Sequence, residues 1–290
     1  MITKRFICSV VVVICTFFLV LSFGVQGAAS LSAIGTLKSA LISEGISKQT
    51  AQNYLRGSVG AVNLKVILKN LSHKEKEGDY ISFLQEKRIA EARQFLGRHC
   101  SLLSDIEKAY GVPKEVIVAI LMVESSLGKD HGRYLVFGVY TSLASMLDRK
   151  VRESVRREAA KAGIDINSPA FKKRITSKAT WGLQELACLL RLSEKGKVDP
   201  FRLKGSWAGA FGMPQFIPSS FEKYGIDWDG DGKVKLDRLP DAAASVANYL
   251  KTHGWKKGMG PAGALGVIKR YNHSQPYADA ILELSKCLKR

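Results

Sequence analysis

The stretch GAFGMPQFIPSSFEKYGIDWDGDGKVKL, residues 209–236, joins an aromatic segment rich in Gly and Pro directly to a run of alternating aspartates. Because Gly and Pro mark turns and loops, the first half of the stretch is predicted to be a loop. The second half spaces Asp227, Asp229 and Asp231 as in the first part of a calcium-binding EF-hand loop. The stretch therefore predicts a shaped loop beside a metal-binding segment.

The acidic run matches an EF-hand only in part. Gly232 stands where such a loop turns, and Lys233 follows with a backbone carbonyl at the seventh position. The twelfth position, normally a bidentate Glu, is Arg238, whereas Asp241 could close a longer loop. Three aspartates this close together would repel one another without a cation, so a structural Ca²⁺ site is predicted. An exposed acidic turn is the alternative.

The N-terminus carries a targeting signal. Lys4 and Arg5 precede an uncharged, mostly apolar run from Phe6 to Phe23, which is typical of a secretory signal peptide. We therefore expect residues 1–27 to be a signal peptide and the protein to be exported to the periplasm or cell envelope. The run is also just long enough to span a bilayer, so an uncleaved anchor that holds the protein at the membrane is the alternative.

Composition bounds the remaining possibilities. With 290 residues, 46% of them hydrophobic, the chain can bury a substantial core. Its net charge of +18 favours polyanionic surfaces such as cell-wall polymers or acidic lipids, unless the cations merely solvate helix faces. Export argues against nucleic acid. Outside the leader only Cys100, Cys188 and Cys287 remain, which implies no disulfide framework. Zinc-ligand spacings and G-x-S-x-G are absent from the sequence, and no organic cofactor is indicated.

Helical periodicity runs through most of the chain, and strand signals are few. Residues 28–108 repeat apolar side chains at three- and four-residue steps and predict a helical N-terminal region without evident chemistry. Residues 109–290 predict a core that contains a basic helical insertion at about 148–200. The predicted fold class is therefore mainly α.

Glu124 is the candidate catalytic carboxyl. It lies near the end of GVPKEVIVAILMVESSLG, residues 111–128, which predicts a buried helix. Three, four and seven positions before it, on the same helix face, stand Leu121, Ile120 and Ile117. Loss of hydration on such a face would raise the pKa of the carboxyl toward the range of a general acid. The alternative is that the helix ends there and the carboxylate points into water.

Aromatic and amide side chains gather in the last third of the chain. Flat rings and amides suit a saccharide cleft, because sugar rings present C–H faces and hydroxyl edges. Core packing is the alternative for each ring taken alone. These residues are Phe211, Phe216, Trp228, Tyr249, Trp255, Tyr271 and Tyr277, with Gln215, Asn248 and Asn272 among them.

Four segments, in this order, resemble the membrane-bound lytic murein transglycosylase B family of peptidoglycan-cleaving enzymes: residues 111–128, 205–236, 241–255 and 271–281. The resemblance implies a lysozyme-like α+β core with an EF-hand-like calcium loop. It also implies that one glutamate, here Glu124, serves first as acid and then as base. The family cuts the MurNAc-GlcNAc β-1,4 bond and lets the sugar's own C6 hydroxyl attack, which leaves 1,6-anhydro ends.

The same resemblance implies the remaining site residues and the partner. The partner would be peptidoglycan glycan strands, bound by a monomer. A hydrolytic muramidase and a non-catalytic, calcium-dependent glycan-binding module are the alternatives. Ser206 and Gln215 match cleft residues near the glutamate, Tyr249, Tyr271, Asn272 and Tyr277 match the wall around the N-acetyl group, and Asp227, Asp229, Asp231, the carbonyl of Lys233, and Asp241 match an extended calcium loop.

Overall fold

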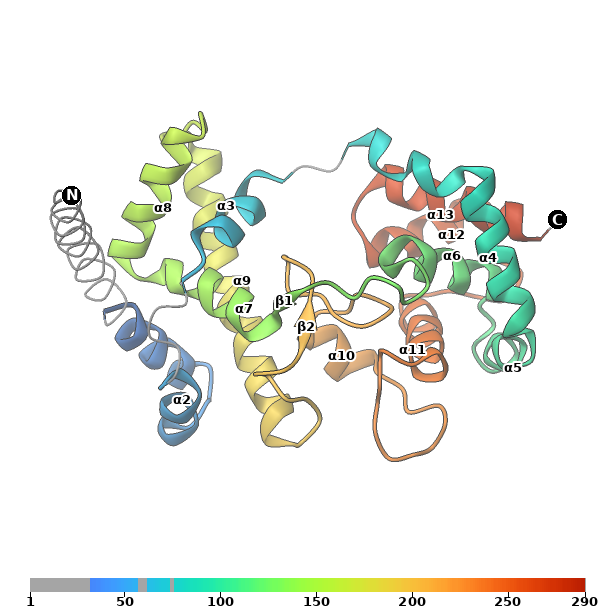
Figure 1. Cartoon of the computed structure of the whole chain (residues 1–290), viewed down its shortest axis with the longest axis horizontal. Helices are drawn as coiled ribbons and strands as arrows, with labels where there is room; N and C mark the ends of the chain where they lie inside the picture. Colours follow the sequence, from blue (N-terminus) through green and yellow to red (C-terminus); the bar gives the residue numbers. More distant parts are fainter. Residues whose placement is uncertain (1–31, 57–61, 74–75, 290) are drawn as a thin grey trace, which may run out of the picture. The chain divides into compact units, whose positions relative to one another are not determined.

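The computed structural model describes residues 32–56, 62–73 and 76–289 (Figure 1). The leader expected at 1–27, and with it the anchor alternative, lies outside these residues. The described chain is mainly helical, which confirms the predicted fold class. Its one sheet among the described residues is a short antiparallel pair, β1 (Tyr134–Leu135) and β2 (Lys204–Gly205).

The chain folds as two packing units. One comprises the described residues of Met1–Leu71 together with Tyr140–Ala187, and the other comprises Ser72–Val139 with Cys188–Arg290. These units do not follow the boundary expected at residue 108. The reason is that residues far apart in sequence contact one another. Most of the basic segment packs with the N-terminal helices, whereas residues 72–108 pack with the core.

The described residues of the first unit form helices and the loops between them. Its longest helix, α9, approaches α7 so closely that a Cβ on Gly182 would lie 2.6 Å from the Cβ of Leu143, so only glycine fits at that crossing. Tyr140, fully buried, packs edge-on against Trp181 with ring centroids 5.6 Å apart. The elements are a helical segment at 32–43, α2 (Lys48–Leu55), α3 (Leu64–Ser72), α7 (Val136–Ala144) from Tyr140 onward, the short helix η2 (Ser145–Leu147), α8 (Arg149–Lys161) and α9 (Pro169–Glu194) as far as Ala187. The start of α7 and the end of α9 belong to the second unit.

The start of α8 is fixed by a carboxylate N-cap, Asp148. One of its oxygens accepts the N–H groups of Lys150 at 2.9 Å and Val151 at 3.1 Å, and the other accepts the hydroxyls of Ser32 at 2.9 Å and Thr36 at 3.2 Å. Burial alone would raise the pKa of Asp148, but these four hydrogen bonds outweigh it and the pKa lies below its ordinary value. The contacts tie segment 32–43 to the beginning of α8.

Replacing Asp148 by Ala is expected to destabilise the first unit by about 1–2 kcal/mol at neutral pH, since the cap of α8 is lost. The folded pKa of this carboxyl is depressed, so its contribution is present above the unfolded pKa of about 3.9 and disappears as pH falls through the lower folded value. The stability difference between wild type and variant should therefore narrow in acid. Urea unfolding at several pH values measures it, with the exposed Asp165→Ala as control. Equal stability at neutral pH would contradict the prediction.

The second unit surrounds α6 (Lys114–Ser125) with helices, as Figure 1 shows for α4, α11 and α13. From Val116 to Met122 every residue of α6 is at most 4% exposed, so the helix predicted over 111–128 is buried. The other elements are η1 (Glu77–Leu84), α4 (Glu86–Arg98), α5 (Cys100–Tyr110), α10 (Pro218–Tyr224), α11 (Leu239–Thr252), α12 (Pro261–Tyr271) and α13 (Gln275–Leu288).

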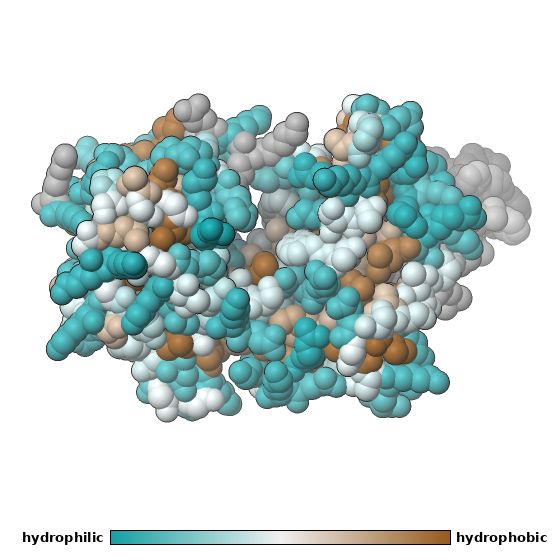
Figure 2. Space-filling model, turned by 180° about the vertical axis from the view of Figure 1, so that it is seen from behind, coloured by the Kyte–Doolittle hydropathy of each residue, from teal (hydrophilic) through white to brown (hydrophobic). Residues whose placement is uncertain are grey.

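The face of the molecule in Figure 2 is covered largely by hydrophilic residues, with apolar residues in small groups. Within the described ranges, no helix has both the length and the apolar character needed to cross a membrane.

Candidate active site

Glu124 occupies the last turn of α6, half-buried. Ile117, Ile120 and Leu121, which the sequence places on its face, are all fully buried. The hydroxyl of Tyr277, on α13, donates a hydrogen bond to Oε1 of Glu124 at 2.7 Å. The carboxyl is therefore held against the protein by a phenol 153 positions away in sequence and does not simply extend into water.

The hydroxyl of Ser125 links α6 to the loop that follows β2. Its Oγ donates to the carbonyl oxygen of Met213 at 2.8 Å and, within the helix, to that of Leu121 at 3.2 Å. The same oxygen accepts the N–H of Gly128 at 3.0 Å. Because Ser125 directly follows Glu124, this buried network fixes the position of the last turn of α6 relative to the loop.

The turn after the glutamate is strained. Ser126 and Leu127 have φ angles of 50° and 61°, a region that residues with a Cβ adopt at a cost. The guanidinium of Arg88, on α4, donates to Oγ of Ser126 at 2.8 Å, and Arg88 is paired in turn with Glu91 at 2.9 Å. Arg88 thus holds the strained turn from α4, and backbone strain of this kind is concentrated at functional sites.

Tyr271 and Tyr277 form a parallel stack beside the glutamate, with ring centroids 6.5 Å apart and planes inclined by 9°. The hydroxyl of Tyr271 donates to the carbonyl oxygen of Pro214 at 2.6 Å. Burial raises the pKa of both tyrosines well above 10, and the negative charge of Glu124 raises it further. Both phenols consequently remain protonated hydrogen-bond donors throughout the physiological pH range.

Tyr249 supports this stack from α11. Its ring packs edge-on against Tyr271 and Tyr224 with centroids 4.8 and 4.7 Å away. Its hydroxyl donates to the carbonyl oxygen of Arg270 at 2.6 Å, and burial raises its pKa to about 12. The structure therefore brings all three expected wall tyrosines together, and the hydroxyl of Tyr249 binds the backbone of α12.

Gln215 lies in a closed loop opposite the end of α6. Phe211 and Phe216 exchange backbone hydrogen bonds of 2.9 and 3.1 Å across this loop. Gln215 has a φ of 49°, and its side-chain amide donates to the carbonyl oxygen of Gly212 at 2.8 Å. A glutamine held in this unfavourable conformation indicates a functional constraint on the loop.

Ser206 and Asn272, the other expected cleft residues, stand at the ends of elements. Ser206 follows β2, and its Oγ accepts the N–H groups of Ala208 and Ala210 at 3.3 and 3.2 Å. Asn272 caps the C-terminus of α12, where its N–H donates to the carbonyl oxygen of Ile268 at 3.2 Å. Both are half-buried in the second unit, which also contains Glu124.

Tyr80 is a residue of this cluster that the sequence interpretation missed. It belongs to η1, in the region expected to be helical without chemistry, and its ring packs edge-on against Tyr277 with centroids 5.6 Å apart. No motif or periodicity marks it, and only the packing of η1 against α13 reveals it.

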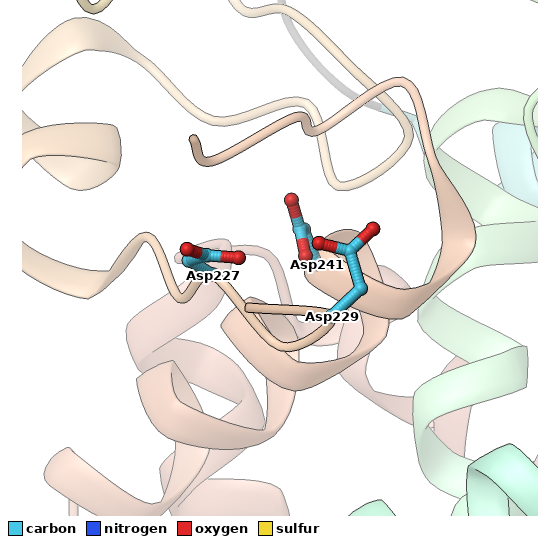
Figure 3. A group of neighbouring side chains, drawn as sticks. All are labelled: Asp227, Asp229 and Asp241. Atoms are coloured by element: carbon cyan, nitrogen blue, oxygen red, sulfur yellow. The ribbon is translucent and has the colours of Figure 1, made fainter. Parts of the chain in front are cut away.

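The acidic loop gathers three carboxylates. Asp227, Asp229 and Asp241 each offer an oxygen, and these oxygens lie within 4.8 Å of one another. Figure 3 shows the three side chains converging, Asp241 from the first turn of α11 and the other two from the preceding loop. Asp231, the fourth expected ligand, is instead paired with the ammonium group of Lys235. Lys233 lies in the same loop, and its N–H donates to Asp231 at 3.0 Å.

The donor set fits a hard cation such as Ca²⁺. Asp241, only 1% exposed, accepts the N–H groups of Trp228 at 2.9 Å and Lys235 at 2.6 Å, and Asp227 accepts those of Gly230 and Gly232. These bonds hold the two carboxylates in place. Each carboxylate oxygen can accept two partners and here accepts one N–H, so a lone pair remains on each oxygen for a cation. Closely grouped oxygen donors on a fixed loop are what Ca²⁺ requires.

Residues 30–265 match the model of a family described as the transglycosylase SLT domain. The chain is 34% identical, over 176 residues, to the membrane-bound lytic murein transglycosylase B of Escherichia coli K12. The matched region spans 61% of this chain and 41% of that protein, less than half of the relative's length.

Solved structures share the fold. The soluble lytic transglycosylase SltB1 from Pseudomonas aeruginosa matches with a TM-score of 0.68 and 26% identity, over 89% of this chain and 98% of that one. The Escherichia coli lytic transglycosylase Slt35, in its complex with calcium, matches with a TM-score of 0.67 over 89% and 92% of the two chains; at 23% identity this likeness shows the fold alone. The family match covers residues 30–265, which is most of this chain, so the chain belongs to the transglycosylase SLT domain family.

Proposed function

We propose that this protein is a lytic transglycosylase that cleaves the MurNAc-GlcNAc β-1,4 bond of peptidoglycan and leaves 1,6-anhydro-MurNAc ends. The observation that carries the proposal is the half-buried Glu124, whose carboxyl is oriented by the hydroxyl of Tyr277 at 2.7 Å. Its membership of the transglycosylase SLT domain family and the identity of a relative named lytic murein transglycosylase B support the assignment.

In the proposed reaction Glu124 first donates its proton to the glycosidic oxygen as the bond to C1 of MurNAc breaks. It then takes the proton of the C6 hydroxyl as that oxygen bonds to C1, so no water is consumed and the carboxyl returns to its starting state. Glycosidases usually need two carboxylates. One suffices here because the substrate supplies the nucleophile. Tyr277 keeps the carboxyl oriented in both steps, since burial holds its pKa well above 10 and its proton in place.

Tyr271, Asn272, Ser206 and Gln215, all half-buried, are proposed to bind the sugar, and the buried rings of Tyr249 and Tyr277 are proposed to support Tyr271 from within the protein. Aromatic faces match the C–H faces of a pyranose, and amide and hydroxyl groups match its N-acetyl and hydroxyl groups. Glycan strands are accordingly the proposed partner of a monomeric protein, which we place in the cell envelope because of its apolar leader sequence.

A structural Ca²⁺ is proposed for the loop 227–241. Asp227, Asp229 and Asp241 would bind it through their carboxylates, with the Lys233 carbonyl and Asp231 as further ligands. The ion would neutralise grouped negative charge and fix the chain between α10 and α11. It takes no part in the reaction.

Product analysis tests the proposal against the two alternatives. Mass spectrometry of digested sacculi should detect muropeptides with anhydro ends. Reducing ends would instead show a hydrolytic muramidase, in which water attacks C1. No soluble product, with retained binding to sacculi, would indicate a non-catalytic glycan-binding module. Either of these results would overturn the transglycosylase assignment.

Tyr277→Phe is expected to lower the cleavage rate by about 10- to 100-fold. The reason is that the variant loses a hydrogen bond to a charged group, and such a bond contributes about 1.5–3 kcal/mol. The ring and its packing remain, so the fold should be kept. Tyr249→Phe is the matched control, because that hydroxyl bonds the carbonyl oxygen of Arg270 and not the glutamate. Turnover of sacculi by the two variants measures the difference, and equal rates would refute a role for Tyr277 in orienting the carboxyl.

A further inference from the structure

The helix α8 carries an unusual concentration of positive charge. Its 13 residues, RKVRESVRREAAK, include six Lys or Arg and two Glu. Val151, Val155 and Ala159 are buried, so one face packs into the first unit and the charged residues occupy the rest of the surface. The helix is therefore a fixed cationic ridge whose apolar side is already used.

Most of these cations lack an acidic partner. The two glutamates pair with the residues near the ends of the helix, Arg149 with Glu153 at 3.7 Å and Lys161 with Glu158 at 2.8 Å. The other four, which we call the α8 cations, have no carboxylate within 4.0 Å among the residues that the structure describes. The α8 cations are Lys150, Arg152, Arg156 and Arg157, of which only Arg156 is half-buried and the other three are exposed.

Unpaired cations at this density indicate an anionic partner. Like charges on one short helix destabilise it, and an anion on the surface would relieve that repulsion. Arginine, three of the four α8 cations, suits phosphate in particular, because its guanidinium donates two parallel hydrogen bonds. At 1.5 Å per residue the α8 cations span about 10 Å, and the helical period places Lys150 and Arg157 on one side of the helix and Arg152 and Arg156 on another, so they present charge over an open surface rather than in a pocket.

The position of α8 in the chain favours a membrane over other polyanions. Asp148, its N-cap, accepts the hydroxyl of Ser32 at 2.9 Å. The apolar run Phe6–Phe23 ends nine residues before that serine, which fixes the reach between them at about 30 Å or less. Where the run is the uncleaved anchor, the alternative to a cleaved signal peptide, a chain held at a bilayer in this way would keep α8 within reach of the headgroups. Nucleic acid and soluble polymers have no such link to the first unit.

We propose that the α8 cations form a docking surface for anionic phospholipid headgroups. The surface acts by charge alone, because the apolar face of α8 is buried and cannot insert. It supplements the apolar run, as a single hydrophobic signal and a basic patch together hold proteins at membranes better than either does. This surface is independent of the proposed cleavage of glycan.

The test uses the full chain and two sets of vesicles, phosphatidylcholine alone and phosphatidylcholine with phosphatidylglycerol. The apolar run should bind both sets, whereas the α8 cations should favour the anionic set. Replacing the α8 cations together by Gln is expected to lower the ratio of the two partition coefficients by about tenfold or more, given the contribution of each cation near an anionic surface. A matched control removes four exposed lysines of the second unit: Lys87, Lys197, Lys256 and Lys257.

Three results together would support the proposal. The preference of the wild-type protein for anionic vesicles should fall as salt is raised, should be lost in the α8 variant and should be kept in the control. A ratio near one for wild type would overturn it, and so would an equal loss in both variants, which would show a net-charge effect. If the α8 variant instead loses binding to DNA or to a soluble glycerol-phosphate polymer while its vesicle ratio is unchanged, the surface serves that polyanion and the proposal is wrong. Circular dichroism establishes that each variant is folded.

Discussion

Glu124→Gln is expected to lower the rate of muropeptide release by about 10³-fold or more, because a carboxyl that acts as acid and then as base is lost from both steps. Glutamine has the same shape, and its amide oxygen can still accept the hydroxyl of Tyr277. The variant should therefore keep its fold and its affinity for glycan strands. Muropeptide release from purified sacculi, followed by liquid chromatography, measures the rate.

Glu115→Gln is the matched control for this substitution. It removes a carboxyl from the first turn of the same helix, where Glu115 lies 3.8 Å from the ammonium group of Lys114 and far along α6 from the proposed site. Its activity should be close to that of wild type. Retained activity in Glu124→Gln would remove the catalytic assignment, whereas equal losses in the two variants would point to damage of α6 rather than to lost chemistry.

The sequence was sufficient to predict the helix that presents this glutamate. Apolar residues at 117, 120 and 121 define the buried face, and the prediction needs only the helical period. The pattern could not reveal what meets that face. The partner of the carboxyl is Tyr277, which α13 brings in from 153 positions away, and no local pattern encodes a contact of that kind.

The same limit explains the division into packing units. The sequence predicts helices in residues 72–108 and in the basic segment after residue 148, and the structure confirms both. Which unit each segment joins depends instead on contacts between distant residues, such as that of Ser32 with Asp148, 116 positions apart. Tyr80 was missed for this reason. A tyrosine in a polar, weakly periodic segment gives no signal until η1 packs against α13.

Saturating Ca²⁺ is expected to raise the melting temperature of the wild-type protein by about 5–10 °C. Binding at 100 times Kd stabilises the folded state by about 2.7 kcal/mol, and each kcal/mol moves the melting temperature of a unit of this size by about 2–4 °C. Asp227→Asn and Asp229→Asn should largely lose the shift, because each removes one charged ligand from the group of three. Calorimetry with and without Ca²⁺ measures the shift within each variant, so any change in baseline stability cancels.

Asp237→Asn is the control, since it removes an exposed carboxylate from the same loop without touching the group of three. Its shift should equal that of wild type, and equal shifts in all variants would exclude a metal at this loop. Asp231→Asn decides a separate question. The sequence makes Asp231 a ligand, whereas the structure pairs it with Lys235. If Ca²⁺ draws this carboxylate away from the lysine, the variant loses part of the shift; if the ion pair persists, the shift is unchanged and the Ca²⁺ is bound by Asp227, Asp229 and Asp241 without it.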